Sequence, residues 1–289
     1  MALAAITPVA APAAKSLFSA IGITAAIERA AELKALGADF IVETVAGFLM
    51  PFASDAEFAA HRASALAAAL PVRGCNSFLR DPSLICVGPR ADHPRVLAYT
   101  ATACARLRSI GGEYIVFGSN TARQIPAGWS KPQADGQFIA LLRAMSTIAQ
   151  ENRITIGVEM QRREECNYLN HIEEVVNVVA ATNHPNIRVL ADLYHMRVAG
   201  DSPEQLARAM PWVGVVELAE RAQRTLPGVA GDDFRPYFSA LSQAGYRGLV
   251  DIEGNGTADQ LRHAFETVRR QADDAMQAPR VTARDQRAR

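Results

Sequence analysis

The sequence predicts an α/β fold, a single-domain (β/α)8 barrel, from three observations. Short apolar runs alternate with longer amphipathic segments about eight times along the chain. The runs are apolar at most positions, which is typical of parallel strands covered on both faces. No glycine-rich dinucleotide fingerprint follows the first run, which disfavours an open, doubly wound sheet. Eight units within about 260 residues fit the closed (β/α)8 arrangement, the TIM barrel.

The expected strands are the apolar runs, in order LFSAI, FIVE, RGCNSF, YIVF, TIGVE, VLAD, VGVVEL and LVDIE, at residues 17–21, 40–43, 73–78, 114–117, 155–159, 189–192, 213–218 and 249–253. The amphipathic segments predict helices at residues 25–36, 56–69, 96–110, 137–152, 172–181, 203–209, 234–244 and 258–275. Capping residues support several ends: Gly37 follows the first helix, Asp55 precedes the second, Ser202 precedes the sixth and Gly245 follows the seventh.

No Pro/Gly/Ser-rich linker divides the chain, so one barrel domain is expected over residues 15–276. Residues 1–14 are expected to be a loose lead-in, because the segment lacks the positive start of a signal peptide and Pro8 and Pro12 interrupt it. The charged, apolar-poor residues 277–289 are expected to form a flexible tail. The four cysteines form no CxxC pair, so we expect buried thiols and a cytoplasmic location.

Composition excludes several classes of protein. Thirty basic residues balance 30 acidic ones, so the chain lacks the basic surface of a nucleic-acid binder. It is 49% hydrophobic and 21% charged, which excludes disorder for most of its length. No apolar run reaches the roughly 18 residues of a membrane span.

Carboxylates recur where the predicted strands end. Glu159, Asp192 and Glu253 each end a strand in the second half, Glu217 lies at a corresponding depth, and Glu43 ends an earlier strand. The carboxyl ends of barrel strands open onto the face that carries active sites. Acids gathered there repel one another and require a cation or shared protons.

A divalent metal satisfies this requirement. Oxygen ligands favour Mn²⁺, which we expect, with Mg²⁺ or Co²⁺ as alternatives. The competing interpretation is a structural network in which the acids pair with nearby arginines: Arg162, Arg163, Arg221 and Arg224.

Residues just beyond the strands are further candidates. His195 follows Asp192 by three places, Glu165 and Asn170 follow Glu159, and Arg224 lies in the long loop after the seventh strand. Three other histidines, His61, His184 and His263, occur in patterns typical of solvated or packed side chains.

These segments resemble the xylose-isomerase-like family of sugar (phosphate) isomerases and epimerases, which includes D-tagatose 3-epimerases and hydroxypyruvate isomerases. The resemblance is carried by VFGSNTARQIPAGW, VEMQRREECNYLN, ADLYHM, PGVAGDDFRPYFSAL and GYRGLVDIE, and spans roughly residues 15 to 270. It implies metal carboxylates at Glu159, Asp192 and Glu253, with Glu159 and Glu253 also acting as the acid/base pair. It implies substrate contacts for His195, Arg224 and Glu165.

The chain departs from the family pattern at two positions. The family usually has a metal-binding histidine in a pattern like HVHIAD, whereas this chain reads VVELAE, with Glu217 at the histidine position and Glu220 at the following acid. Arg162 stands where relatives commonly have asparagine. Two hypotheses follow: Glu217 is a fourth metal carboxylate, or it pairs with an arginine and the metal is weakened or absent.

The resemblance implies a divalent-metal-dependent isomerase or epimerase of a small polyhydroxylated ketone, working by proton transfer through an enediolate. The alternative is a lyase or dehydratase that acts on a keto-sugar, keto-glycoside or keto-inositol through the same chemistry. A non-catalytic binding protein is the other-class alternative, and the three-zinc barrels that repair abasic DNA are disfavoured by the few histidines. The expected partner is a carbohydrate, with no nucleic acid or membrane; phosphorylation of the substrate and a homodimer stay open.

Overall fold

Eight parallel strands close into a barrel in the computed structural model, which describes residues 16–277. The strand order around the barrel is the chain order, and β8 pairs with β1 to close it. This confirms the predicted (β/α)8 barrel. The strands are β1 (Ala20–Thr24), β2 (Phe40–Thr44), β3 (Val72–Asn76), β4 (Tyr114–Phe117), β5 (Thr155–Glu159), β6 (Ile187–Asp192), β7 (Val213–Leu218) and β8 (Leu249–Ile252).

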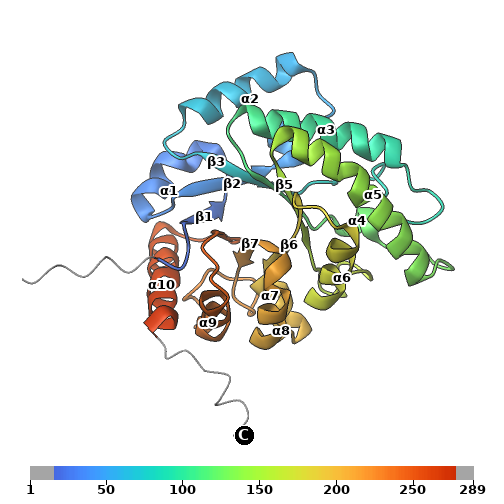
Figure 1. Cartoon of the computed structure of the whole chain (residues 1–289). Coiled ribbons are helices and arrows are strands. Elements are labelled where there is room, and N and C mark those ends of the chain that lie inside the picture. The colour runs from blue at the N-terminus through green and yellow to red at the C-terminus, as the bar shows by residue number, and fades with distance from the viewer. Residues whose placement is uncertain (1–15, 278–289) are drawn as a thin grey trace, which may run out of the picture.

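Helices surround the strands as an outer ring, and the first and last of them, α1 and α10, lie beside each other (Figure 1). The helical segments are η1 (Ile27–Arg29), α1 (Ala30–Leu36), η2 (Val45–Leu49), α2 (Asp55–Ala67), α3 (His93–Ser109), α4 (Asn120–Arg123), α5 (Lys131–Asn152), α6 (Ile172–Thr182), α7 (Leu193–Ala199), α8 (Pro203–Ala209), η3 (Met210–Trp212), α9 (Arg235–Gln243) and α10 (Ala258–Gln277).

The first strand begins three residues later than expected. Leu17 and Phe18 are buried, but Phe18 packs edge-on against Phe238 of α9 instead of joining the sheet. Pairing of Ala20 with Leu249 fixes where β1 begins. The apolar signal at residues 17–18 therefore comes from packing against a helix, which hydrophobicity alone cannot distinguish from a strand.

Two short helices and one long one differ from the expectation. The sequence pattern did not indicate α4, which begins three residues after the last residue of β4, or α7, which begins directly after β6. Helix α5 begins six residues before the expected start, because Ser130 caps it in a capping box with Gln133 and Pro132 occupies its first turn, where proline is tolerated.

The core has two parts. A large cluster fills the space between the strands and the helices. A smaller cluster fills the barrel interior and includes Phe40, Tyr114, Leu190 and Leu249. Tyr114 lies across Gly74, where a Cβ atom would overlap its ring, and so its hydroxyl reaches Asp251 at 2.9 Å.

The four cysteines are all free and buried, as expected. Among residues 16–277, no helix is long and apolar enough to cross a membrane. The expected lead-in, residues 1–14, lies outside the described residues, as does the expected tail apart from Gln277, which ends α10.

Candidate active site

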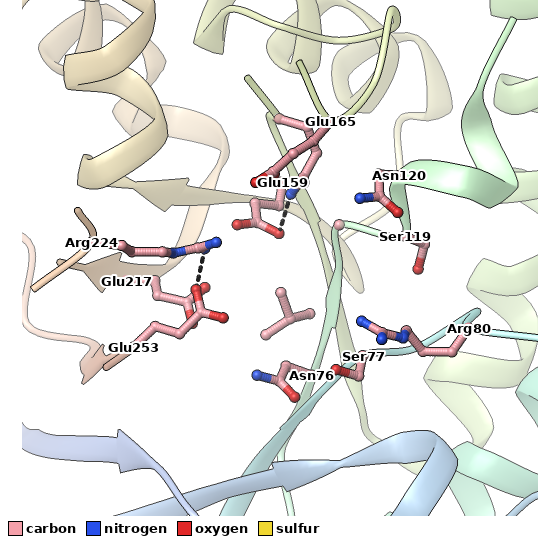
Figure 2. Close-up of a pocket in the computed structure, with 13 residues that line it drawn as sticks. Asn76, Ser77, Arg80, Ser119, Asn120, Glu159, Glu165, Glu217, Arg224 and Glu253 are labelled. Atoms are coloured by element: carbon pink, nitrogen blue, oxygen red, sulfur yellow. Dashed lines mark hydrogen bonds and ion pairs between the residues drawn. The ribbon is translucent and has the colours of Figure 1, made fainter. Parts of the chain in front are cut away.

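A cavity of about 210 Å³ opens at the carboxyl ends of the strands (Figure 2). Two sets of residues line it. One contains Glu159, Glu217 and Glu253, and these three with the neighbouring Asp192 are called the acidic cluster below. The other comes from the end of β3 and from the segments that follow β3 and β4, and it is called the distal wall: Asn76, Ser77, Arg80, Ser119 and Asn120. The acids thus come from one arc of the barrel and the distal wall from another.

Strand register brings the acidic cluster together. Glu159 is the last residue of β5 and Asp192 the last of β6, while Glu253 directly follows β8. Asp192 is the register partner of Glu217 on β7, and Glu217 is the partner of Asp251 on β8. Glu159 is the partner of Leu190, two residues before Asp192, and Asp251 lies two residues before Glu253. Because residues two apart on a strand share a face, all four acids face the barrel interior near the carboxyl ends of the strands.

The distances suit a metal site. Ligand atoms of Glu159, Asp192 and His195 lie within 4.8 Å of one another, and so do those of Asp192, Glu217 and Glu253. Asp192 belongs to both groups and is fully buried. The two groups therefore form one continuous set of five potential ligands.

Burial raises the proton affinity of the three glutamates of the acidic cluster. The pKa of Glu159 is raised well above its ordinary value by burial and then by the carboxylates of Asp192 and Glu253. Burial, followed by Asp251 and Glu253, raises the pKa of Glu217 in the same way. Burial raises the pKa of Glu253 to about 7, against the opposing effect of Arg224. Without a cation, the cluster is relieved by taking up protons.

Glu217 decides whether the donor set fits a cation. Its side chain is 1% exposed, and its Oε1 atom is buried with no hydrogen-bond partner among the described residues. It forms no ion pair with an arginine of residues 16–277. A buried carboxylate oxygen without a donor is costly, and a divalent cation held by Glu217 and its neighbours would satisfy it. The residues present therefore fit a metal ion.

Arg224 reaches the cluster from the loop after β7. Its Nη2 atom donates to Glu253 Oε2 and lies 3.5 Å from Asp192 Oδ2, and its guanidinium lies 4.7 Å from the centre of the Tyr194 ring. These carboxylates raise its pKa. Gln223 and Arg224 both adopt a left-handed backbone, with φ of 56° and 55°, a conformation that non-glycine residues rarely adopt.

Glu220 holds that loop in place. It is fully buried, and its carboxylate accepts hydrogen bonds from the backbone N–H groups of residues 228, 230, 231 and 232 and from the Thr225 hydroxyl. Charge-assisted bonds of this kind are about twice as strong as neutral ones. Glu220 is therefore a positioning residue for the loop that carries Arg224.

His195 faces the cluster from helix α7. Its Nδ1 atom accepts from the backbone N–H of Arg162 at 3.2 Å, which leaves Nε2 at 3.6 Å from both Glu159 Oε1 and Asp192 Oδ2. Burial lowers its pKa, which favours the neutral ring. Helix α7 is held at its start by Asp192, whose Oδ1 accepts from the Tyr194 N–H at 2.7 Å.

The remaining candidates are divided between the site and its surroundings. Glu165 lines the cavity, and its carboxylate pairs with Arg162 at 2.7 Å. Asn170 does not line the cavity; its side-chain amide donates to the backbone carbonyls of Gln161 and Cys166. Of the four arginines proposed to neutralise the acids, Arg224 is the one that contacts the cluster within the described part of the chain.

Glu43 does not belong to the site, although it lies near the end of a strand. Its carboxylate accepts from the N–H of Ile27 at 2.6 Å and of Thr44 at 3.1 Å, and it does not line the cavity. The expectation that strand-end acids converge is therefore wrong for β2, whose glutamate binds backbone groups outside the cavity.

Two features of the site escaped the sequence analysis. Asn76, Ser77 and Arg80 of the distal wall lie in none of the family-like segments, and Ser119 and Asn120 lie in VFGSNTARQIPAGW without any spacing that marks them as cavity residues. Asp251 lies beneath the cluster, fully buried and bonded to the Tyr114 hydroxyl, and burial raises its pKa to about 7. Its position two residues before Glu253 in LVDIE places it on the same side of β8, a signal that strand alternation offered.

The model of the xylose isomerase-like TIM barrel family matches residues 27–271. The chain belongs to this family. Among curated proteins it is similar to the L-ribulose 3-epimerase of Methylomonas sp. (strain DH-1), with 28% identity over 116 residues, which is 40% of each chain. The alignments with curated relatives cover 33% to 40% of those proteins' lengths.

Solved structures of similar fold cover nearly the whole domain. An L-ribulose 3-epimerase superimposes with a TM-score of 0.73 at 18% identity, covering 91% of this chain and 99% of that one. The 3-keto-D-glucoside 4-epimerase from E. coli gives 0.70 at 18% identity, covering 88% and 98%. At these identities the likeness concerns the fold.

Proposed function

We propose that this chain is a divalent-metal-dependent isomerase or epimerase of a small polyhydroxylated ketone. The observation that carries the proposal is the pair Glu159 and Glu253, which face one cavity from β5 and β8, with the strands of Asp192 and Glu217 between them. Family membership and the partial similarity to an L-ribulose 3-epimerase support the same chemistry.

Glu159 and Glu253 are the proposed acid and base. One removes the proton beside the ketone and the other returns a proton, so the substrate carbon is approached from two sides and passes through an enediolate. Burial raises the pKa of Glu253 to about 7 in the metal-free protein, and a cation bound beside it would lower this pKa and favour the ionised form that accepts a proton. Gln161 holds Glu159 by donating to its Oε2 at 2.8 Å.

Glu159, Asp192, Glu217 and Glu253 are the proposed metal ligands, with Mn²⁺ favoured by their oxygen atoms and Mg²⁺ or Co²⁺ as alternatives. His195 is left out of this set, because its Nδ1 accepts from the Arg162 N–H and a neutral ring then carries its proton on Nε2, the nitrogen that faces Glu159 and Asp192. A divalent ion bound there would supply Lewis-acid stabilisation of negative charge on the substrate oxygens. His195, Arg224 and Glu165 are the proposed substrate-binding residues, since each presents a polar group at the cavity or the cluster.

The test is a screen of ketopentoses, ketohexoses and 3-keto-glycosides in D2O with added Mn²⁺, read by NMR. Deuterium incorporation with all carbon and oxygen atoms retained is expected; release of water or an aglycone would instead support a lyase. Glu159→Gln and Glu253→Gln should each reduce incorporation by about 100-fold or more.

Glu43→Gln is the matched control, since Glu43 is a buried glutamate near a strand end that does not line the cavity. It should retain activity if the variant remains folded by circular dichroism. Incorporation that survives in Glu253→Gln within tenfold, or a wild-type protein inert toward every ketone in the screen, would contradict the proposal.

A further inference from the structure

The cavity offers opposite kinds of hydrogen-bonding group on its two sides. The acidic cluster presents mainly carboxylate oxygens, which accept. The distal wall has no acid among its members, and Figure 2 shows the Arg80 guanidinium turned into the cavity from the side opposite Glu253 and Arg224. A ligand that bridges the cavity therefore meets unlike chemistry at its two ends.

Arg80 has no carboxylate partner. It forms no ion pair within 4.0 Å among residues 16–277, whereas Arg224, the other cavity-lining arginine, pairs with Asp192 and Glu253. Asp81, the nearest acid along the chain, is engaged elsewhere: its Oδ1 accepts from the Ser83 N–H at 2.8 Å and from the Ser83 hydroxyl at 2.5 Å. Arg80 is exposed at the mouth of the cavity, and its guanidinium is turned toward the cavity with no carboxylate partner among residues 16–277.

The neighbours of Arg80 have donors left for a ligand. The Ser119 hydroxyl oxygen already accepts from the Leu79 N–H at 3.0 Å, so its proton is available to donate. Asn120 uses its Oδ1 atom to accept from the Thr121 N–H at 2.7 Å, which leaves its NH2 group for the cavity. A guanidinium, a hydroxyl and an amide NH2 group together match a group of several acceptor oxygens.

Asn76 is suited to the middle of the substrate. Its side chain is 8% exposed, it lines the cavity, and its Oδ1 atom is buried without a hydrogen-bond partner in the described part of the chain. An unpartnered buried acceptor requires a donor from the ligand, and a substrate hydroxyl supplies one. The small cavity, about 210 Å³, lies below the roughly 300 to 1,000 Å³ typical of sites for larger ligands.

We propose that the substrate is a short polyhydroxylated ketone with an anionic group, a carboxylate or a phosphate, at the end remote from the acidic cluster, and that Arg80 binds this group. The inference rests on the proposed function for the position of the ketone end. The direction follows from the two cavity-lining arginines: Arg224 is already paired with Asp192 and Glu253, whereas Arg80 has no carboxylate partner among the described residues and is free to bind an anion. Ser119 and Asn120 complete the binding of the anion.

The kinetic test compares three congeners of one ketose: the neutral sugar, its terminal phosphate and its terminal carboxylate. Deuterium incorporation gives kcat/KM for each with the Mn²⁺-loaded wild type and with Arg80→Met. The wild type should prefer one of the two anionic congeners, and the better of the two identifies which anion is recognised. Arg80→Met should lower the anionic-to-neutral ratio of kcat/KM by about 10-fold or more, the loss of a charge-assisted contact.

Arg90→Met is the control, since Arg90 is an exposed arginine of the same β3–α3 loop and does not line the cavity. It should preserve the ratio. A wild type that turns over the neutral ketose at least as well as both anionic congeners would overturn the inference while leaving the proposed function in place. An equal loss for neutral and anionic congeners in Arg80→Met would overturn it as well.

If no ketone reacts, measurements of equilibrium binding still test the anion site independently of the proposed isomerase or epimerase activity. Inorganic phosphate and succinate are titrated calorimetrically into metal-free wild type and Arg80→Met. Binding to the wild type that weakens about 10-fold or more in the variant supports the anion site without any turnover. No binding of either anion to the wild type, or equal binding to both proteins, overturns it.

Discussion

Replacing Glu217 with glutamine should have opposite effects on the metal-free and the metal-loaded protein. Carboxylate oxygens of Asp192, Glu217 and Glu253 lie within 4.8 Å of one another. At that separation and an effective dielectric constant of about 20, each pair of full charges repels by about 3.5 kcal/mol. Proton uptake relieves part of this repulsion, so the expected gain in the free energy of unfolding is about 1 to 3 kcal/mol.

The assay is thermal unfolding at pH 8. This pH lies above the pKa of Glu253, about 7, so protonation of Glu253 relieves less of the repulsion between the carboxylates than it does at lower pH. Metal-free Glu217→Gln should melt about 2 to 6 °C above the metal-free wild type. Its Mn²⁺ affinity, measured by calorimetry, should fall at least about 10-fold, because a charged oxygen ligand is lost. The stabilisation that Mn²⁺ provides should shrink accordingly.

Glu220→Gln is the matched control, because Glu220 is also fully buried and lies three residues further along the chain. Its carboxylate accepts from backbone N–H groups, so its loss should lower the metal-free melting temperature, with a cost of about 2 to 3 kcal/mol. The reasoning is refuted if Glu217→Gln destabilises the metal-free protein as Glu220→Gln does, or if its Mn²⁺ affinity equals that of the wild type.

Three further predictions follow from the same contacts. Gly118→Ala places a Cβ atom where it would overlap Oε2 of Glu159 and displace that carboxylate. The kcat for deuterium exchange should therefore fall about 100-fold while the melting temperature stays nearly unchanged. A wild-type rate would contradict this. The melting temperature of the metal-free protein should fall as pH rises from about 4.5 to 8. Glu253 and Asp251 have folded-state pKa values of about 7, above their unfolded values near 4, so the folded state binds more protons in this range and its stability declines with pH. Saturating Mn²⁺ should flatten this dependence, and a metal-free melting temperature that rises with pH would refute it. Arg106→Ala should lower the free energy of unfolding, measured in urea, by about 3 kcal/mol. The buried Arg106 guanidinium donates to the carbonyls of residues 49, 50 and 53 and to the carboxylate of residue 55, which begins α2. A loss below about 1 kcal/mol would show that these bonds contribute little.

The local sequence pattern was sufficient to predict a side chain's position wherever that position depends on the strand that carries the side chain. The bounds of β4, β5 and β7 agree with the expectation. The acids of β5 to β8 meet because each faces the barrel interior near the carboxyl end of a parallel strand. Pattern failed at residues 17–18, where apolar residues pack on a helix, and at Glu43, whose carboxylate binds backbone groups outside the cavity. The contacts that decide these two cases, Phe18 with Phe238 and Glu43 with the Ile27 N–H, join residues whose separation in the sequence follows no helix or strand period.

The sequence by itself determined the barrel and the gathering of carboxylates at its carboxyl end, because apolar runs alternate with amphipathic helices and four of the later runs carry an acid at or near their ends. Tertiary structure alone decided which cations meet those acids. Arg224 reaches them because Glu220 holds its loop, whereas Arg80 faces the cavity with no carboxylate of its own. The conformation of a loop depends on hydrogen bonds that follow no helix or strand period, so a periodic sequence pattern does not predict them.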